Sequence, residues 1–329
     1  MITQILQFMC ARGAGEASLR RFISFVTRHD YDESSKELSN PETISQNFKV
    51  RIDVAKNIID SQIQAKIITE QLEKENVITT WIGHKLYPSK LVNTLDKSAP
   101  PVLFCKGNIE IFEQDGVGFC GSRKASEKGL VITSKCAEQL VQRKISVISG
   151  YAHGVDLSAH KAALRNGGNT IFVLVEGILR FQKKREILDF LSDKNFLAVS
   201  QFPPLLTWSA MNAMHRNSTI IGLSKAMILV ESGLKGGTFA AGEETLKRHQ
   251  PLFVIDFAAP GPSAEANPYF IEKGGLAIRG SRDGHPNISK VFDIVSHCTS
   301  RNSVENEIPT TENSTGKNVS HGKQGSLLD

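Results

Sequence analysis

Residues 117–154 read VGFCGSRKASEKGLVITSKCAEQLVQRKISVISGYAHG, and this stretch decides the fold. It opens with a short apolar segment, 117–120, and closes with a second, 146–149, and each runs directly into a glycine. Short apolar runs bounded by glycine are typical of buried strands. The amphipathic residues between them, 128–142, are predicted to form a helix. Strand, helix and strand in this order form a βαβ unit, in which the two strands are parallel.

The same alternation continues to residue 278. Further strands are predicted at 170–174, 196–199, 226–230, 252–256 and 277–278, with helices near 157–166, 184–191 and 238–248. Repeated strand–helix units at this spacing favour a parallel sheet with helices on both faces. We therefore predict an α/β protein in which residues 117–298 form a Rossmann-like, doubly wound, mostly parallel sheet.

The segments on either side of this domain have a different character. Apolar residues recur at helical spacing in 1–76, including one long run over 52–75, which predicts a small helical domain of the SAM or helix-hairpin-helix type. Such a module either grips a DNA backbone or serves only as a packing unit, and both alternatives stay open. Residues 77–116, with a short strand at 102–105, are expected to connect the two domains and pack on the core. The polar tail, 299–329, is expected to be disordered.

Composition narrows the class of protein. The chain has 329 residues and a net charge of +5, and residues 119–250 carry 18 Lys and Arg against 10 Asp and Glu. This local excess of +8 favours a polyanionic partner. An N-terminus without a secretory signal and a chain without a long apolar run predict a cytoplasmic protein with no membrane partner. The five cysteines lack metal-binding spacing, so no metal or cofactor is expected.

Three of the predicted strands, those at 117–120, 146–149 and 226–230, run into glycine and other small residues. In an open α/β sheet the ligand crevice lies beyond the carboxyl ends of the strands, where glycine lets backbone N–H groups approach an anion. Basic and polar side chains follow the same strands. We predict that the following residues bind phosphate or nucleic acid, with no catalytic residue among them: Gly121, Ser122, Arg123, Gly150, His153, Gly154, Asp156, His160, Lys161, Arg216, Asn217, Gly236, Gly237 and Thr238.

Two of these candidates also have a structural explanation. Asp156 opens a predicted helix, where a carboxylate often caps the backbone, and His160 lies one turn further on the same face. Capping and local hydrogen bonding are favoured over metal ligation, because spacing supplies no third ligand. The run Lys183-Lys184-Arg185 is interpreted as a solvated helix face.

Ordered motifs along the chain resemble the DNA-processing protein A family (DprA, also called Smf), within the Rossmann-like superfamily that includes the LOG nucleotide hydrolases. The resemblance covers about residues 78–280. The motifs are Tyr87-Pro88, Pro101–Phe104 with Lys106-Gly107-Asn108, Gly121-Ser122-Arg123, Ser149–Asp156, Ala159-His160, Ala163-Leu164, Gly167–Thr170 and Arg216-Asn217. The resemblance implies a dimer that binds single-stranded DNA without sequence preference and loads a RecA-type recombinase. It assigns DNA contact to Arg123 and Arg216.

The chain departs from the family pattern at several points. His153 and Ser218 stand where the family has arginines, and 179–185 replace a loop containing Tyr-Pro. No counterpart of the family's winged-helix domain is recognisable in the polar tail, so this is a divergent member.

Two alternative functions follow from these departures. One is a DNA- or nucleotide-sensing regulator, such as an antitoxin, in an anti-phage system with a toxin from a neighbouring gene. The other is a LOG-like nucleotide N-glycosidase, because Gly236-Gly237-Thr238 with Glu243 and Glu244 partly resembles the LOG motif. In that enzyme Glu243 or Glu231 would act on the sugar.

Overall fold

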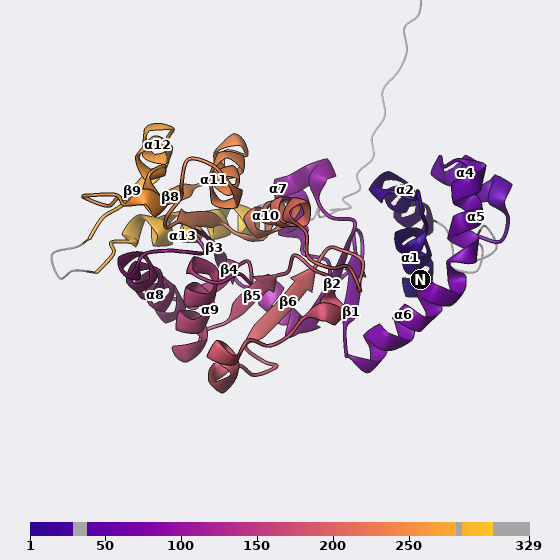
Figure 1. Cartoon of the computed structure of the whole chain (residues 1–329), viewed down its shortest axis with the longest axis horizontal. Helices are drawn as coiled ribbons and strands as arrows, with labels where there is room; N and C mark the ends of the chain where they lie inside the picture. Colours follow the sequence, from indigo (N-terminus) through magenta and orange to yellow (C-terminus); the bar gives the residue numbers. More distant parts are fainter. Residues whose placement is uncertain (29–37, 281–284, 305–329) are drawn as a thin grey trace, which may run out of the picture.

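The computed structural model describes residues 1–28, 38–280 and 285–304. A nine-stranded sheet runs through the molecule in the order β1-β2-β6-β5-β4-β3-β7-β8-β9 (Figure 1). Its parallel part consists of β3 (Gly116–Cys120), β4 (Ser146–Ser149), β5 (Thr170–Val173), β6 (Phe196–Ser200), β7 (Ala226–Leu229), β8 (Leu252–Ile255) and β9 (Leu276–Ile278). The predicted Rossmann-like α/β fold is confirmed.

Strand β3 pairs with β4 on one side and with β7 on the other, although β7 lies far along the chain. The strand order therefore reverses at β3. Where the strand order reverses, the loops that follow the two neighbouring strands run in opposite directions and leave a crevice between them. Ligands of open α/β sheets bind in this crevice.

Residues 77–116 do more than connect two domains. They contribute β1 (Ile78–Trp81) and β2 (Val102–Gly107), and β2 pairs antiparallel with β6 and with β1. The predicted connecting segment is therefore the edge of the sheet itself. Between and after these strands lie α7 (Ser89–Leu95), η1 (Asp96–Ser98) and η2 (Ile109–Glu113).

Helices cover both faces of the sheet, because alternate strand residues point to opposite sides. On one face, α7, α10 (Ala210–Leu223), α11 (Gly237–Lys247) and α12 (Asn267–Glu272) share an apolar cluster with inward residues of the sheet such as Ile148. On the other, α8 (Glu127–Gln142), α9 (Val155–Arg165) and α13 (Ser289–Val304) pack around Val117 and Val147. Helix α13 includes residues 299–304, which were predicted to belong to the tail; the rest of the tail lies outside the described residues.

The helix predicted over 184–191 is only a 3-10 turn, η4 (Arg185–Phe190). Within it Ile187 alone is fully buried, so a single apolar anchor holds the segment and no apolar stripe supports a longer helix. Two more turns, η3 (Ile178–Arg180) and η5 (Pro262–Ala264), complete the domain.

The N-terminal residues form the predicted helical module beside β1 (Figure 1). Its described helices are α1 (Ile2–Cys10), α2 (Glu16–Val26), α4 (Pro41–Phe48), α5 (Ile52–Asp60) and α6 (Gln62–Lys74). The run predicted over 52–75 breaks at Ser61 into α5 and α6. The rings of Phe8, Phe22 and Phe48 form the module's core, with centroids 4.8 to 5.6 Å apart.

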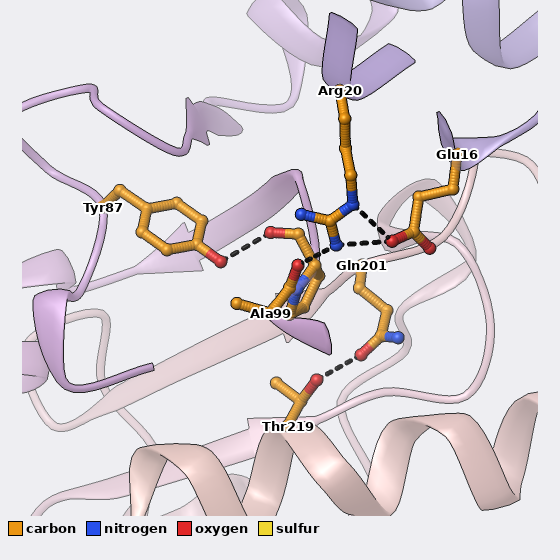
Figure 2. A network of polar contacts seen from close by, with 7 residues as sticks. Glu16, Arg20, Tyr87, Ala99, Gln201 and Thr219 are labelled. Atoms are coloured by element: carbon orange, nitrogen blue, oxygen red, sulfur yellow. Dashed lines mark hydrogen bonds and ion pairs between the residues drawn. The ribbon is translucent and has the colours of Figure 1, made fainter. Parts of the chain in front are cut away.

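Arg20 joins this module to the sheet. From α2 its guanidinium donates to the Glu16 carboxylate and to the carbonyl oxygen of Ala99, just before β2 (Figure 2). The Tyr87 hydroxyl donates to the Pro100 carbonyl at 2.5 Å in the same network. These contacts hold α2 against the entrance to β2. Within the described ranges, no helix is both long and apolar enough to span a bilayer.

Candidate nucleic-acid interface

A cavity of about 850 Å³ opens at the carboxyl ends of β3 and β7, where the strand order reverses. Its walls are the loop after β3 with Gly121, Ser122 and Arg123, the start of α11 with Gly236, Gly237 and Thr238, and residues of α10. Gly236 has φ +103°, a conformation that favours glycine. Ala152 of the loop after β4 also lines the cavity, so the fold brings all three predicted glycine loops to it.

Arg216 lines the floor of this cavity from the middle of α10. Only 5 % of its surface is exposed, and its Nε has no hydrogen-bond partner among the described residues. Burial lowers the pKa of the guanidinium, while the nearby Asp156 carboxylate acts in the opposite direction. A buried cation with an unused donor next to open space is suited to bind an anion.

Asp156 faces Arg216 across Gly150. The carboxylate accepts from the Ser149 hydroxyl at 2.9 Å and from the Ala152 amide at 3.3 Å. Burial raises its pKa, and Arg216 opposes this shift. Asp156 makes local hydrogen bonds, as predicted, but its partners are in the preceding loop, while His160 bonds other residues. The predicted capping of α9 is wrong, because Gly154 occupies the N-cap position. Asp156 thus fixes the loop and partly neutralises Arg216.

His160 is a core residue. The ring is fully buried, with Nε2 2.5 Å from the Gly150 carbonyl and Nδ1 2.6 Å from the Thr170 hydroxyl. Burial lowers its pKa to about 3, so the ring is neutral near pH 7. The prediction that His160 binds phosphate is corrected: it holds Gly150 in place from beneath the loop.

His153 and Lys161 are exposed on the loop after β4 and on α9, and neither lines the cavity. Gly154 next to His153 has φ +77°, and a Cβ there would lie 2.4 Å from the Ser122 carbonyl oxygen. The loop after β4 therefore presses against the loop after β3. This contact places His153 at the border of the cavity, outside it.

Arg123 and Asn217 lie at the cavity rim. The Arg123 guanidinium sits over the ring of Trp208, 5.7 Å from its centroid. The Asn217 side chain donates to the Gly237 carbonyl at 3.1 Å and so braces α10 against the first turn of α11. Arg123 is thus an exposed cation at the mouth, whereas Asn217 has a structural contact of its own.

Lys184 packs on the loop after β4, outside the cavity lining, although its sequence context predicted a solvated helix face. Its ammonium donates to the Tyr151 carbonyl at 2.7 Å and lies 4.7 Å from the centre of the Tyr151 ring. Burial lowers its pKa, with Asp156 and Arg123 among the charges that act on it. Only the fold of η4 against the loop after β4 reveals this placement, since nothing local distinguishes Lys184 from Lys183.

Of the two carboxylates expected for sugar chemistry, Glu231 lines the cavity and Glu243 does not. Glu231 is buried and accepts from the Ser126 amide at 2.9 Å, from the Ser126 hydroxyl, and from the Ser263 hydroxyl at 2.7 Å. Glu243 is exposed on α11, outside the cavity lining, and accepts from the Tyr269 hydroxyl at 3.0 Å. Glu231 therefore anchors the start of α8. No group of three or more His, Cys, Asp or Glu suited to a metal ion occurs in the described part of the chain.

Comparison with known proteins identifies the family. Residues 78–284 match the profile of the DNA recombination-mediator protein A family. The chain belongs to this family. Curated relatives include DNA processing protein DprA of Streptococcus pneumoniae, 28 % identical over 199 residues that cover 60 % of this chain and 69 % of the relative. Protein Smf of Escherichia coli is 30 % identical over 209 residues, which cover 63 % of this chain and 55 % of that protein.

Solved structures of DNA processing protein A share the fold. The protein from Streptococcus pneumoniae superposes with a TM-score of 0.71 and 23 % identity, covering 84 % of this chain and 94 % of that one. The protein from Helicobacter pylori, whose structure was described for its single-stranded DNA binding mode, gives a TM-score of 0.55 at 21 % identity, covering 68 % of this chain and 96 % of the other.

Proposed function

We propose that this chain binds single-stranded DNA without sequence preference and acts in DNA processing as a binding protein, with no catalytic step of its own. Arg216 carries the proposal: it is a buried guanidinium whose Nε has no partner among the described residues, and it lies on the floor of an open cavity. Asp156 offsets part of the charge of Arg216, and a phosphate group would offset the rest and supply an acceptor oxygen for Nε.

Several features favour a polymer over an isolated anion. Arg123 adds a cation at the rim of the cavity, and Lys184 adds a second one beside Tyr151 in the loop after β4. His153 is exposed on the loop after β4 and Lys161 is exposed on α9, and we propose that both contact the strand as it leaves the cavity. Cations spaced along a path bind the repeating phosphates of a single strand and read no base edges. The DNA-binding relative from Helicobacter pylori supports the same proposal.

Fluorescence anisotropy with a labelled 20-nucleotide oligo(dT) tests the proposal. The wild-type protein is expected to bind at low salt, and the affinity is expected to fall steeply as salt rises. Arg123→Ala is expected to weaken binding roughly tenfold and to reduce the salt slope by about one. Arg143→Ala is the matched control, because Arg143 is exposed at the end of α8, where the chain turns to enter β4 and away from the carboxyl ends of the strands. Failure of the wild-type protein to bind at low salt would refute the proposal.

The biological role is a further part of the proposal, and family membership supports it. We propose that the chain acts as a homodimer in the cytoplasm and passes the bound strand to a RecA-type recombinase. Light scattering of the purified protein measures the oligomeric state, and strand-exchange assays with a recombinase measure the transfer. Co-purification with the product of a neighbouring toxin gene, without any effect on strand exchange, would favour the alternative role as a regulator in anti-phage defence.

A further inference from the structure

One wall of the cavity is apolar and open to solvent. Trp208, Met214 and Leu234 all line the cavity, and their exposed fractions are 53 %, 57 % and 58 %. Trp208 lies just before α10, Met214 lies on α10, and Leu234 lies in the loop after β7. Large apolar side chains grouped at the mouth of a cavity mark a surface that a ligand covers.

Arg123 lies between this wall and the cationic floor. Its guanidinium lies over the Trp208 ring, 5.7 Å from the ring centroid. Arg216 also lines the cavity but is buried. The contact is a cation–π pair at an exposed position, where such pairs contribute only about 0.5–1 kcal/mol. A phosphate that binds Arg123 through charge-assisted hydrogen bonds therefore competes well for the guanidinium.

The occupant of the wall must have both an anionic and a flat apolar part. The apolar residues and the cations line one continuous cavity, so a single ligand contacts both. An apolar protein segment would cover Trp208 but would leave Arg216 without an anion. A nucleotide unit satisfies both sides, with its phosphate on the arginines and its base against the indole.

We propose that Trp208 is a base-stacking residue and that Arg123 leaves the indole ring when it takes a phosphate, which frees the ring face for a nucleobase. Phosphate binding and base stacking are then coupled through one side chain. This inference rests on the proposed function. It predicts that the bases contribute to affinity at Trp208 although no base edge is read.

Two oligonucleotides of equal charge separate stacking from phosphate binding. One is a 12-nucleotide oligo(dT), and the other is a 12-nucleotide abasic strand with the same phosphates. Wild-type protein is expected to bind oligo(dT) more tightly than the abasic strand. Trp208→Leu is expected to lose roughly tenfold in affinity for oligo(dT) and little for the abasic strand. Trp208→Phe, which keeps an aromatic face, is expected to restore most of the loss.

Intrinsic fluorescence provides an independent measurement, because the chain contains only two tryptophans. The other, Trp81, lies in β1 at the edge of the sheet, with its ring 4.3 Å from that of His84. Oligo(dT) is expected to quench the fluorescence of the wild-type protein and of Trp81→Phe, and not that of Trp208→Phe.

Each outcome decides one of the two proposals. If the wild-type protein binds neither strand, the proposed function fails. If it binds both strands equally tightly, or if Trp208→Leu weakens both to the same extent, DNA binding stands and stacking on Trp208 is refuted. If Trp208→Leu binds oligo(dT) as tightly as the wild-type protein, stacking on Trp208 is likewise refuted. The apolar wall would then be a candidate surface for a protein partner.

Discussion

Gly150 and Arg216 compete for the same space: a Cβ built on Gly150 would lie 2.1 Å from Nη1 of Arg216. The same Cβ would lie 2.3 Å from Oδ2 of Asp156. The buried guanidinium can reach the floor of the cavity because the residue that directly follows β4 has no side chain. This is a steric requirement on Gly150, separate from any contact of its backbone with a ligand.

Gly150→Ala is therefore expected to displace the end of the Arg216 side chain, since this flexible group gives way more easily than backbone. The affinity for oligo(dT) is expected to fall roughly tenfold, while the free energy of unfolding falls by only about 1–3 kcal/mol. Gly261→Ala is the control, because a Cβ there meets nothing within 4 Å. Anisotropy titration and urea unfolding measure the two effects. If Gly150→Ala binds oligo(dT) as tightly as the wild-type protein, the position of the Arg216 guanidinium is not important for DNA binding.

The buried His160 predicts a pH dependence of stability. Its pKa is lowered to about 3 in the folded protein, while the unfolded chain has the ordinary value near 6.5. Between these two pH values His160 is protonated in the unfolded chain and neutral in the folded protein. Stability is therefore complete above about pH 6.5 and falls as pH decreases, by up to about 1.4 kcal/mol per pH unit from this residue.

His160→Gln is expected to lower the free energy of unfolding at pH 7 and to flatten its dependence on pH between about 6.5 and 4. Urea unfolding at a series of pH values measures this slope. His153→Gln alters an exposed neighbour and is expected to keep the wild-type slope. An unchanged slope in His160→Gln would mean that other groups cause the acid sensitivity.

Glu231 is expected to stabilise the fold, because its carboxylate accepts from Ser126 and Ser263 in a buried position. Glu231→Ala leaves these donors without partners and is expected to cost about 2–4 kcal/mol in urea unfolding. The exposed Glu243→Gln is the matched carboxylate and is expected to cost less than about 0.5 kcal/mol. Release of free base from a nucleoside monophosphate by the wild-type protein, abolished in either variant, would instead favour the N-glycosidase alternative.

Much of the fold could be predicted because its information is local. The apolar runs before Gly121 and Gly150 and the amphipathic segments between them carry the alternation of strands and helices within short windows. The position of the site followed from topology, because parallel strands of one sheet end at one edge and glycines mark those ends. Arg123 and the glycine loop at 236–238 were correctly placed on that edge for this reason.

The role of individual side chains depended on contacts between residues far apart in sequence. His160 and Lys161 are neighbours in the chain, yet one is buried under Gly150 and the other is exposed, because helix α9 packs its His160 face against the sheet. Lys184 contacts the loop after β4 because the chain just before η4 packs on Tyr151, and residues 77–116 form a sheet edge because β2 pairs with β6. Periodicity shows which segments form helices and strands, whereas burial and the neighbours of each charge depend on how those segments pack in three dimensions.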